Sequence, residues 1–169
     1  MGTQNSFYVR TSDDSIIAEI RTRFSVTDVE LGGDFVGFIL SPHAYDPPSS
    51  SLVQLSSDLR TDVIWLSFQS VVDAFEFLHW RSGHALRCLV YGCQEQGIWE
   101  RVEGQTEPWE REAFFRPYSP KLVMPEEERR EWERICREAL LLPGQFEPRI
   151  DARESARKAA EFYHFPGWS

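Results

Sequence analysis

Apolar and polar residues alternate between Asp62 and Glu103 more regularly than anywhere else in the chain. The alternating runs read TDVIWLSFQ, VVDAFEFLHW, ALRCLVYGC and GIWERVE, and turn residues separate them. A period of two places successive side chains on opposite faces of a sheet, and the aromatic and β-branched residues of these runs favour strands. The pattern predicts an antiparallel meander of three or four strands over residues 62–103.

The N-terminal part of the chain shows the patterns of a strand, a helix and a hairpin. The run FYVR alternates as a strand does, and apolar residues then recur at helical spacing over residues 13–24, behind residues that can cap a helix. Gly32 and Gly33 tolerate the positive φ angles of a tight turn, and they separate two strand-like runs at 26–31 and 34–40. We therefore expect a strand, a helix and a β-hairpin here.

The segment from Ser41 to Ser57, SPHAYDPPSSSLVQLSS, is rich in proline and serine. Tandem prolines and repeated serines disfavour regular structure, so the sequence predicts a long loop. Loops of this length are uncommon in compact domains unless they have a function. The loop is either a lid or partner-contacting segment, or a tolerated surface insertion.

The C-terminal part combines an irregular aromatic arm with two helices. The arm mixes prolines with aromatic residues, among them Trp109, and has room for one helical turn at 110–115. Pro125 suits the first turn of a helix and Asp151 suits the N-cap of another, while the tail HFPGWS either docks or moves freely. The expected inward faces are Trp132, Ile135, Cys136, Ala139 and Leu140 in the first helix, and Ala152, Ala156, Ala159, Ala160 and Tyr163 in the second.

Strands in the middle of the chain with helices gathered at its ends indicate an α+β fold with a mostly antiparallel sheet of about five to seven strands. We expect the two C-terminal helices, 125–142 and 151–164, to pack on one face or at one end of this sheet. A length of 169 residues fits a single domain. Its expected parts are a strand–helix–hairpin at 1–40, a long loop at 41–61, the meander at 62–103, the aromatic irregular arm at 104–124 and a helical part at 125–169.

The acidic character of the chain narrows the range of partners. Its formal net charge of −9 disfavours nucleic acids and anionic membranes, because both attract cationic surfaces. Cys88, Cys93 and Cys136 are odd in number and lack a CxxC motif, so reduced cytoplasmic thiols are the simplest interpretation. No secretory signal and no apolar run long enough to span a bilayer is recognisable. The sequence predicts a soluble cytoplasmic protein with no nucleic-acid or membrane partner.

A turn centred on Ser82 and Gly83 would set the register of the second and third meander strands. One face would then be almost entirely apolar and lie against the helices, while the other would be mixed. The implied cross-strand pairs are His79 with Leu86, Phe77 with Cys88, and Phe75 with Val90.

The mixed face gathers most of the candidate functional residues. The cluster there is either a solvated outer face with cross-strand ion pairs, or the polar floor of a cleft covered by the long loop or the aromatic arm. Trp109 lies between two carboxylates in EPWE and is a further candidate for recognition of a ligand or partner. The candidate ligand-binding or interaction residues are Glu76, Trp80, Arg87, Tyr91, Glu100 and Trp109.

Other constellations give weaker signals. The four glutamates between positions 100 and 110 lack the spacing of a hydrolase or metal site and read as a solvated turn. His79 and Cys88 would share one face, but an apolar setting keeps a thiol unreactive. No nucleophile elbow, metal motif or nucleotide-binding glycine pattern is recognisable, so the sequence predicts no catalytic residue, no metal and no cofactor.

The sequence favours a small soluble accessory or protein-interaction protein without catalytic activity. Its partner would be another protein, bound through the aromatic arm at 108–118 and the acidic surface. A small-ligand-binding domain with a pocket on the mixed sheet face is the alternative. A hydrolase-type enzyme that uses the Glu76, Arg87, Tyr91 and Glu100 cluster is the third hypothesis, and the oligomeric state is left open.

Overall fold

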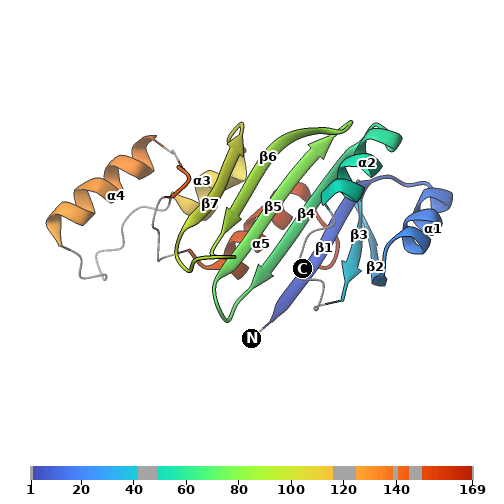
Figure 1. Cartoon of the computed structure of the whole chain (residues 1–169), viewed down its shortest axis with the longest axis horizontal. Helices are drawn as coiled ribbons and strands as arrows, with labels where there is room; N and C mark the ends of the chain where they lie inside the picture. The colour runs from blue at the N-terminus through green and yellow to red at the C-terminus, as the bar shows by residue number, and fades with distance from the viewer. Residues whose placement is uncertain (1, 42–48, 116–124, 139–140, 145–149, 169) are drawn as a thin grey trace.

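A computed structural model of the chain contains a seven-stranded sheet with helices on both faces (Figure 1). The structure describes residues 2–41, 49–115, 125–138, 141–144 and 150–168. In chain order its elements are β1 (Thr3–Arg10), α1 (Asp14–Arg23), β2 (Val26–Gly32), β3 (Phe35–Leu40), α2 (Ser49–Leu59), β4 (Asp62–Gln69), β5 (Ala74–Arg81), β6 (His84–Tyr91), β7 (Trp99–Gly104), α3 (Pro108–Phe114), α4 (Glu126–Glu138) and α5 (Ala152–Tyr163).

The strands lie in the order β2-β3-β1-β4-β5-β6-β7, and all neighbours are antiparallel. The first strand therefore lies inside the sheet, between the β2–β3 hairpin and the β4–β7 meander (Figure 1). The predicted α+β class, the antiparallel sheet, the strand–helix–hairpin and the meander are all confirmed. Within the described residues, no helix is long and apolar enough to cross a membrane.

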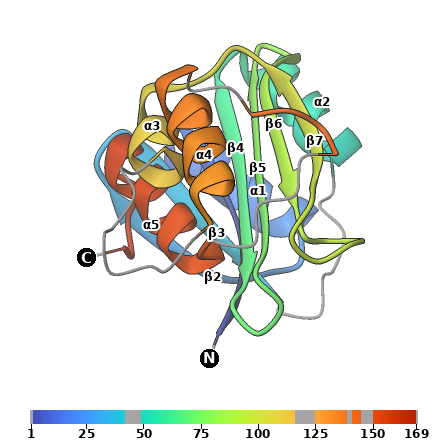
Figure 2. The same cartoon turned by 90° about the vertical axis from the view of Figure 1, so that its left-hand side faces the viewer.

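Helices α1 and α2 cover one face of the sheet, and α3 and α5 cover the other (Figure 2). Each interface has its own apolar core, with Ile20 and Leu52 on the first side and Trp109 and Ala156 on the second. Strands that are covered on both faces bury consecutive residues, so they lose the alternation of polar and apolar positions. Along β4, the stretch from Asp62 to Leu66 is buried throughout.

The predicted long loop is wrong over its second half, because residues 49–59 form α2. Leu52 and Leu55 lie one turn apart on this helix and are 0% and 3% exposed against the sheet. Serine is a poor helix former by only a few tenths of a kcal/mol, roughly, so burial of two leucines outweighs its preference. Residues 42–48, which include all three prolines of the expected loop, lie outside the described part of the chain.

The last helix forms as predicted, and of the two alternatives for the tail the structure shows the docked one. Asp151 caps α5 by accepting a hydrogen bond from the Glu154 amide at 2.9 Å, and the expected alanine face is buried. The tail docks on the sheet: Phe165 stacks on Tyr8 with ring centroids 3.8 Å apart, and Trp168 Nε1 donates to Tyr8 Oη at 2.7 Å. The C-terminal residues therefore close one end of the α5 core.

Helix α4 lies beyond β7, at the end of the molecule (Figure 1). The apolar face expected for this helix lies outside the described side chains and positions. The predicted irregular arm forms α3 over Pro108–Phe114, a longer helix than the single turn expected, and its later residues 116–124 are likewise outside the described part. Of the two C-terminal helices, α5 packs on a sheet face.

Candidate functional site

The register of β5 and β6 differs from the prediction because the pair contains a β-bulge. The ladder shifts between His79 and Trp80, which pair with Arg87 and Ala85, and Leu86 is the extra residue. A one-residue shift moves every following side chain to the other face of the sheet. The predicted pairing is therefore wrong from Leu86 onward.

This shift separates the predicted cluster. Arg87 and Tyr91 lie on the face covered by α3 and α5, where Tyr91 belongs to the apolar core. Glu76 lies on the opposite face, in the same strand as Trp80, which is buried under α2. The grouping of Glu76, Arg87, Tyr91 and Glu100 on one surface is therefore wrong, and Arg87 pairs with another carboxylate.

The aromatic side chains in the described part of the arm are buried rather than exposed. Trp109, Phe114 and Phe115 are 3%, 5% and 6% exposed, and Trp109 packs against Phe77 with ring centroids 4.9 Å apart. The part of the arm that the structure describes therefore belongs to the core between α3 and the sheet. It does not offer the aromatic surface that the sequence predicts for a partner.

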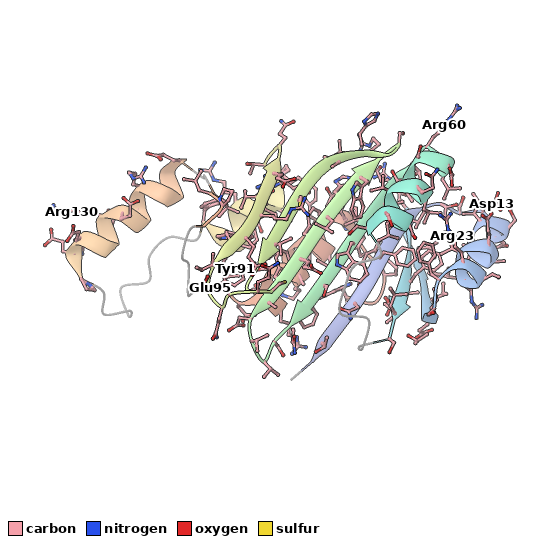
Figure 3. The ribbon with its side chains drawn as sticks, viewed as in Figure 1. Asp13, Arg23, Arg60, Tyr91, Glu95 and Arg130 are labelled. Atoms are coloured by element: carbon pink, nitrogen blue, oxygen red, sulfur yellow. The ribbon has the colours of Figure 1, made fainter. Side chains whose placement is uncertain are left out.

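A pocket of about 420 Å³ opens on the α1–α2 face of the sheet, beyond the end of α2. Its lining comes from β1, β4, β5, β6, β7 and the turns between them, and it includes Glu76 and Glu100. Figure 3 shows Tyr91 and Glu95 at the end of β6 that borders this pocket. Of the six candidate residues, the structure thus brings two together at one cavity.

The floor of the pocket follows from the register of the sheet. Along β1, β4 and β5, the side chains on this face change from apolar to polar at the same level. The row under α2 is Phe7, Trp65 and Leu78, the next row is Asn5, Ser67 and Glu76, and the last is Thr3, Gln69 and Ala74. Within the middle row, Ser67 Oγ donates to Asn5 Oδ1 at 2.7 Å. Helical cover and apolar side chains therefore end together, and the pocket begins there.

The two carboxylates of the pocket are held in different ways. Glu76 Oε2 accepts a hydrogen bond from Trp65 Nε1 at 2.9 Å. Glu100 Oε1 accepts from the backbone amides of Gln94 and Glu95, the latter at 3.0 Å. Glu100 Oε2 is buried and has no hydrogen-bond partner in the described structure. A buried polar atom without a partner is rare, because it costs about 1–3 kcal/mol.

The pocket is electronegative near Cys93. Burial raises the pKa of the Cys93 thiol to about 12, and the charges of Glu76 and Glu100 add to this increase. The thiol is therefore protonated at neutral pH and is a poor nucleophile. Arg101 also lines the pocket, but its Nε and Nη2 atoms donate to Glu103 at 3.1 and 3.0 Å.

The opposite face of the sheet holds a buried ion pair. Arg87 Nε and Nη2 donate to the two carboxylate oxygens of Glu110 at 2.8 and 2.6 Å, and the side chains are 3% and 0% exposed. Arg87 Nη1 also donates to the carbonyls of Glu103 and Gly104. Glu110 accepts in addition from the Glu107 amide, as part of the capping box of α3. The pair connects α3 and the end of β7 to β6.

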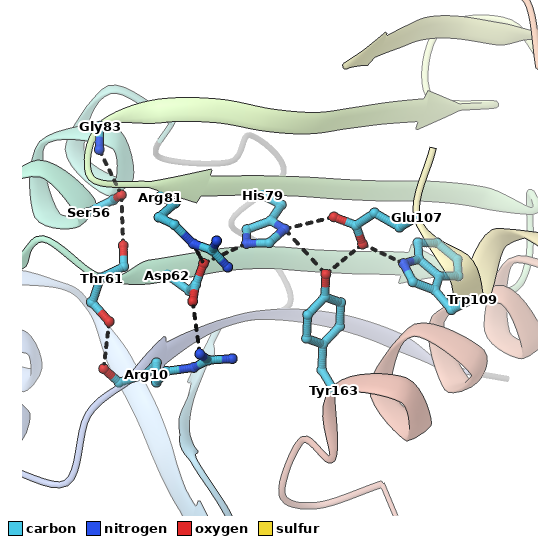
Figure 4. Close-up of polar contacts among 10 residues, drawn as sticks. All are labelled: Arg10, Ser56, Thr61, Asp62, His79, Arg81, Gly83, Glu107, Trp109 and Tyr163. Carbon is cyan, nitrogen blue, oxygen red and sulfur yellow. Dashed lines mark hydrogen bonds and ion pairs between the residues drawn. The ribbon is translucent and has the colours of Figure 1, made fainter. Parts of the chain in front are cut away.

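Beside this pair, His79 lies between two carboxylates (Figure 4). Its Nδ1 is 2.8 Å from Glu107 Oε1, and its Nε2 is 3.0 Å from Asp62 Oδ1. Burial lowers the pKa of His79, but the hydrogen bonds to Asp62 and Glu107 outweigh burial and raise it. The two carboxylates therefore favour the protonated ring, which in that form donates to a carboxylate on each side and has no lone pair for use as a base.

Further residues connect this network to α3, α5 and the surface. Tyr163 Oη and Trp109 Nε1 donate to Glu107 Oε2 at 2.6 and 2.7 Å. Arg81 Nε donates to Asp62 Oδ1 at 2.7 Å, and Arg10 Nη1 lies 3.4 Å from Asp62 Oδ2 (Figure 4). The network thus joins β1, β4, β5, α3 and α5, and the two arginines place it at the edge of the core.

Sequence reasoning missed these buried charges because it assigned the glutamates of the 100–110 segment to a solvated turn. Glu110 is instead fully buried. The signal that could have found it is the E-x-x-E spacing of Glu107 and Glu110 around Pro108, which matches a helix start with a capping box. Within the described residues, no group of three or more His, Cys, Asp or Glu side chains is arranged to hold a metal ion.

Comparison with known proteins assigns no family, since no family model, curated protein or solved structure matches the chain.

Proposed function

We propose that the protein is a small binding protein without catalytic activity, and that its ligand binds in the sheet pocket. The observation that carries this proposal is the pocket itself, whose volume of about 420 Å³ lies within the range of small-molecule sites. Polar residues line its floor on three neighbouring strands at one level, directly beside an apolar core. An apolar boundary beside a few convergent polar groups is typical of ligand sites.

The surroundings of the potential catalytic residues favour binding over catalysis. Both ring nitrogens of His79 contact carboxylates, and Cys88 lies on the other face of the sheet, so the two cannot form a nucleophile–base pair. Burial raises the pKa of the Cys88 thiol to about 11, which keeps it protonated. Arg87 and Glu110 form hydrogen bonds with each other and with backbone groups. These contacts support structural roles for the buried polar residues.

An accessory protein that binds another protein is the second candidate, and the β4–β5 turn favours it. Val71 and Val72 are 63% and 40% exposed on this turn, and Val72 also lines the pocket. Adjacent exposed valines at the rim of a polar pocket would suit contact with a protein surface. This interface replaces the aromatic arm, whose described aromatic residues are buried.

A thermal-shift screen with a matched pair of variants tests the first proposal. Ala74 lines the pocket, so Ala74→Trp fills it, whereas Val71→Trp adds the same ring on the preceding β4–β5 turn, outside the lining. A ligand at a hundred times its Kd should raise the Tm of the natural protein and of Val71→Trp by about 5–10 °C. Ala74→Trp should abolish the shift. If polar, cationic, anionic and aromatic compounds all give no shift that depends on Ala74, the pocket is not a ligand site.

A further inference from the structure

Arg10, Asp62 and Arg81 form the last row of side chains on the α3–α5 face of the sheet. Asp62 pairs with Arg81, and Arg10 directly follows the last β1–β4 pair, so the three residues lie at one level on neighbouring strands. The Asp62 side chain is 6% exposed, whereas those of Arg10 and Arg81 are 46% and 56% exposed. The carboxylate is therefore the buried base of this row, and the two guanidinium groups are its accessible rim on either side (Figure 4).

Contacts with the core hold both guanidinium groups in place. Arg81 Nε donates to Asp62 Oδ1 at 2.7 Å, and Arg10 Nη1 lies 3.4 Å from Asp62 Oδ2. The Arg10 guanidinium also lies over the ring of Phe35, 5.0 Å from its centroid. Within the described residues, no hydrogen bond is made by the Nη atoms of Arg81 or by the Nε and Nη2 atoms of Arg10. The two groups are thus positioned, and most of their N–H donors are left for a ligand.

The row carries more positive than negative charge. Two guanidinium groups share the one carboxylate of Asp62, and further inside the protonated form of His79 is balanced by Glu107 at 2.8 Å. One positive charge at the rim is therefore left without a counter-charge. The formal net charge of the whole chain is −9, but exposed charges more than about 8 Å away are largely screened at physiological ionic strength. The local surplus therefore favours an anion at this rim.

We propose that Arg10 and Arg81 together bind a phosphate group, at a site separate from the pocket. Arginine suits phosphate because its planar fork donates parallel hydrogen bonds and is weakly hydrated. A tetrahedral phosphate presents oxygens in several directions and can accept from both guanidinium groups, whereas a carboxylate presents two oxygens in one plane. The row lies on the opposite face of the sheet from the pocket and at the other end of β1 and β4, so this inference goes beyond the proposed function and does not depend on it.

Nuclear magnetic resonance of the ¹⁵N-labelled protein measures binding directly, because each arginine has its own Nε–H signal. Sodium phosphate is the probe, and sodium chloride at the same ionic strength is the control for screening. Phosphate should shift the Arg10 and Arg81 signals saturably, and chloride should not. Sodium acetate, a planar monoanion, should bind more weakly than phosphate. Glycerol 3-phosphate then separates a phosphate group carried by a small molecule from the free ion.

Variants with the same change of charge assign the effect to the two arginines. Arg10→Gln and Arg81→Gln each remove one guanidinium group from the rim, whereas Arg21→Gln removes an exposed one from α1, on the other face of the sheet. The first two should weaken phosphate binding about tenfold or more, and Arg21→Gln should change it less than about twofold. Arg81→Lys keeps the charge beside Asp62 but lacks the fork, so its affinity should lie between those of the natural protein and Arg81→Gln. This variant still tests the site if Arg81→Gln unfolds.

Three results would overturn this inference. If chloride at equal ionic strength shifts the two arginine signals as phosphate does, the shifts report screening and not a site. If Arg21→Gln weakens phosphate binding as much as Arg81→Gln, binding follows net charge alone. If neither phosphate nor glycerol 3-phosphate gives a saturable shift, Asp62 alone satisfies the two arginines. None of these results bears on the pocket, which the Ala74-dependent thermal screen tests separately.

Discussion

Replacement of Arg87 by methionine tests whether the buried ion pair holds α3 on the sheet. Methionine retains an unbranched apolar side chain but removes the five N–H donors of the guanidinium group. Glu110, which is 0% exposed, would lose the two charge-assisted hydrogen bonds at 2.8 and 2.6 Å. The carbonyls of Glu103 and Gly104 would lose a donor as well.

The magnitude follows from the burial of the remaining charge. Removal of one partner from a buried ion pair costs about 3–5 kcal/mol, because the other charge stays in the core without compensation. Glu110→Gln should cost about the same, although its amide oxygen can still accept from the Glu107 amide. The double variant Arg87→Met with Glu110→Gln leaves no buried charge, so we expect it to cost less than about 3 kcal/mol.

The free energy of unfolding, measured by urea titration for all four proteins, gives the coupling between the two residues. The pH dependence provides a second check. Burial raises the pKa of Glu110, although Arg87 and the Glu107 amide act to lower it. When the pKa of a carboxyl group is higher in the folded than in the unfolded state, the folded protein loses stability as pH rises from the unfolded pKa through the folded pKa. Since methionine removes the stronger lowering contact, the defect of Arg87→Met should be larger at pH 8 than at pH 5.

Two results would refute this reasoning. A cost below about 1 kcal/mol for Arg87→Met would mean that the pair is not a buried charge interaction in solution. Additive single costs in the double variant would mean that Arg87 and Glu110 do not interact.

Two further predictions concern the same part of the fold. The folded pKa of His79 is raised, so its contribution to the free energy of unfolding should be complete below about pH 6.5 and be lost as pH rises through that folded pKa. The contribution of Asp62 should instead be lost as pH falls from its unfolded pKa of 3.8 to about 2. Burial opposes the low pKa of Asp62, but hydrogen bonds from His79 and Arg81 outweigh it. Because the alkaline decline comes from His79, urea midpoints measured against pH should lose that decline in His79→Asn; an unchanged profile would contradict this assignment. Gly104 has φ of +84° and an added Cβ would lie 2.0 Å from the Leu86 carbonyl oxygen, so Gly104→Ala should cost more than about 3 kcal/mol. Gly144→Ala, at a similar φ of +77° but with nothing within 4 Å, should cost only about 1 kcal/mol, and equal Tm losses would exclude the close approach as the cause.

The elements that the sequence predicted correctly depend on local physical rules. Helix α5 could be predicted because its N-cap, Asp151, and its stripe of alanines all lie within one short segment of the chain. Gly33 has the positive φ of +64° that the expected hairpin turn needs. Helix α2 was missed because its burial depends on a sheet that forms around it.

The β5–β6 register could not be predicted for a related reason. Between Cys88 and Tyr91 every residue of β6 is buried, so no polar side of the strand indicates which face is which. The bulge at Leu86 then changes the face of Arg87 without a visible change in pattern. From sequence alone, a charged residue in such a strand is expected to face solvent. The burial of Arg87 is explained only by its bidentate contact with Glu110.

The sequence nevertheless contains a signal for the position of the pocket, and this signal is distributed over three strands. On the face that meets α2, every second residue of β1, β4 and β5 points the same way. Along each strand these residues are large and apolar under α2, and polar or small beyond it. Each change alone is an ordinary strand end, and only the pairing of Asn5 with Ser67 and of Ser67 with Glu76 places the changes at one level. A site of this kind has no motif, because its residues are far apart in the chain and are aligned by strand register. The fold class therefore follows from local alternation, whereas the candidate site follows from long-range pairing.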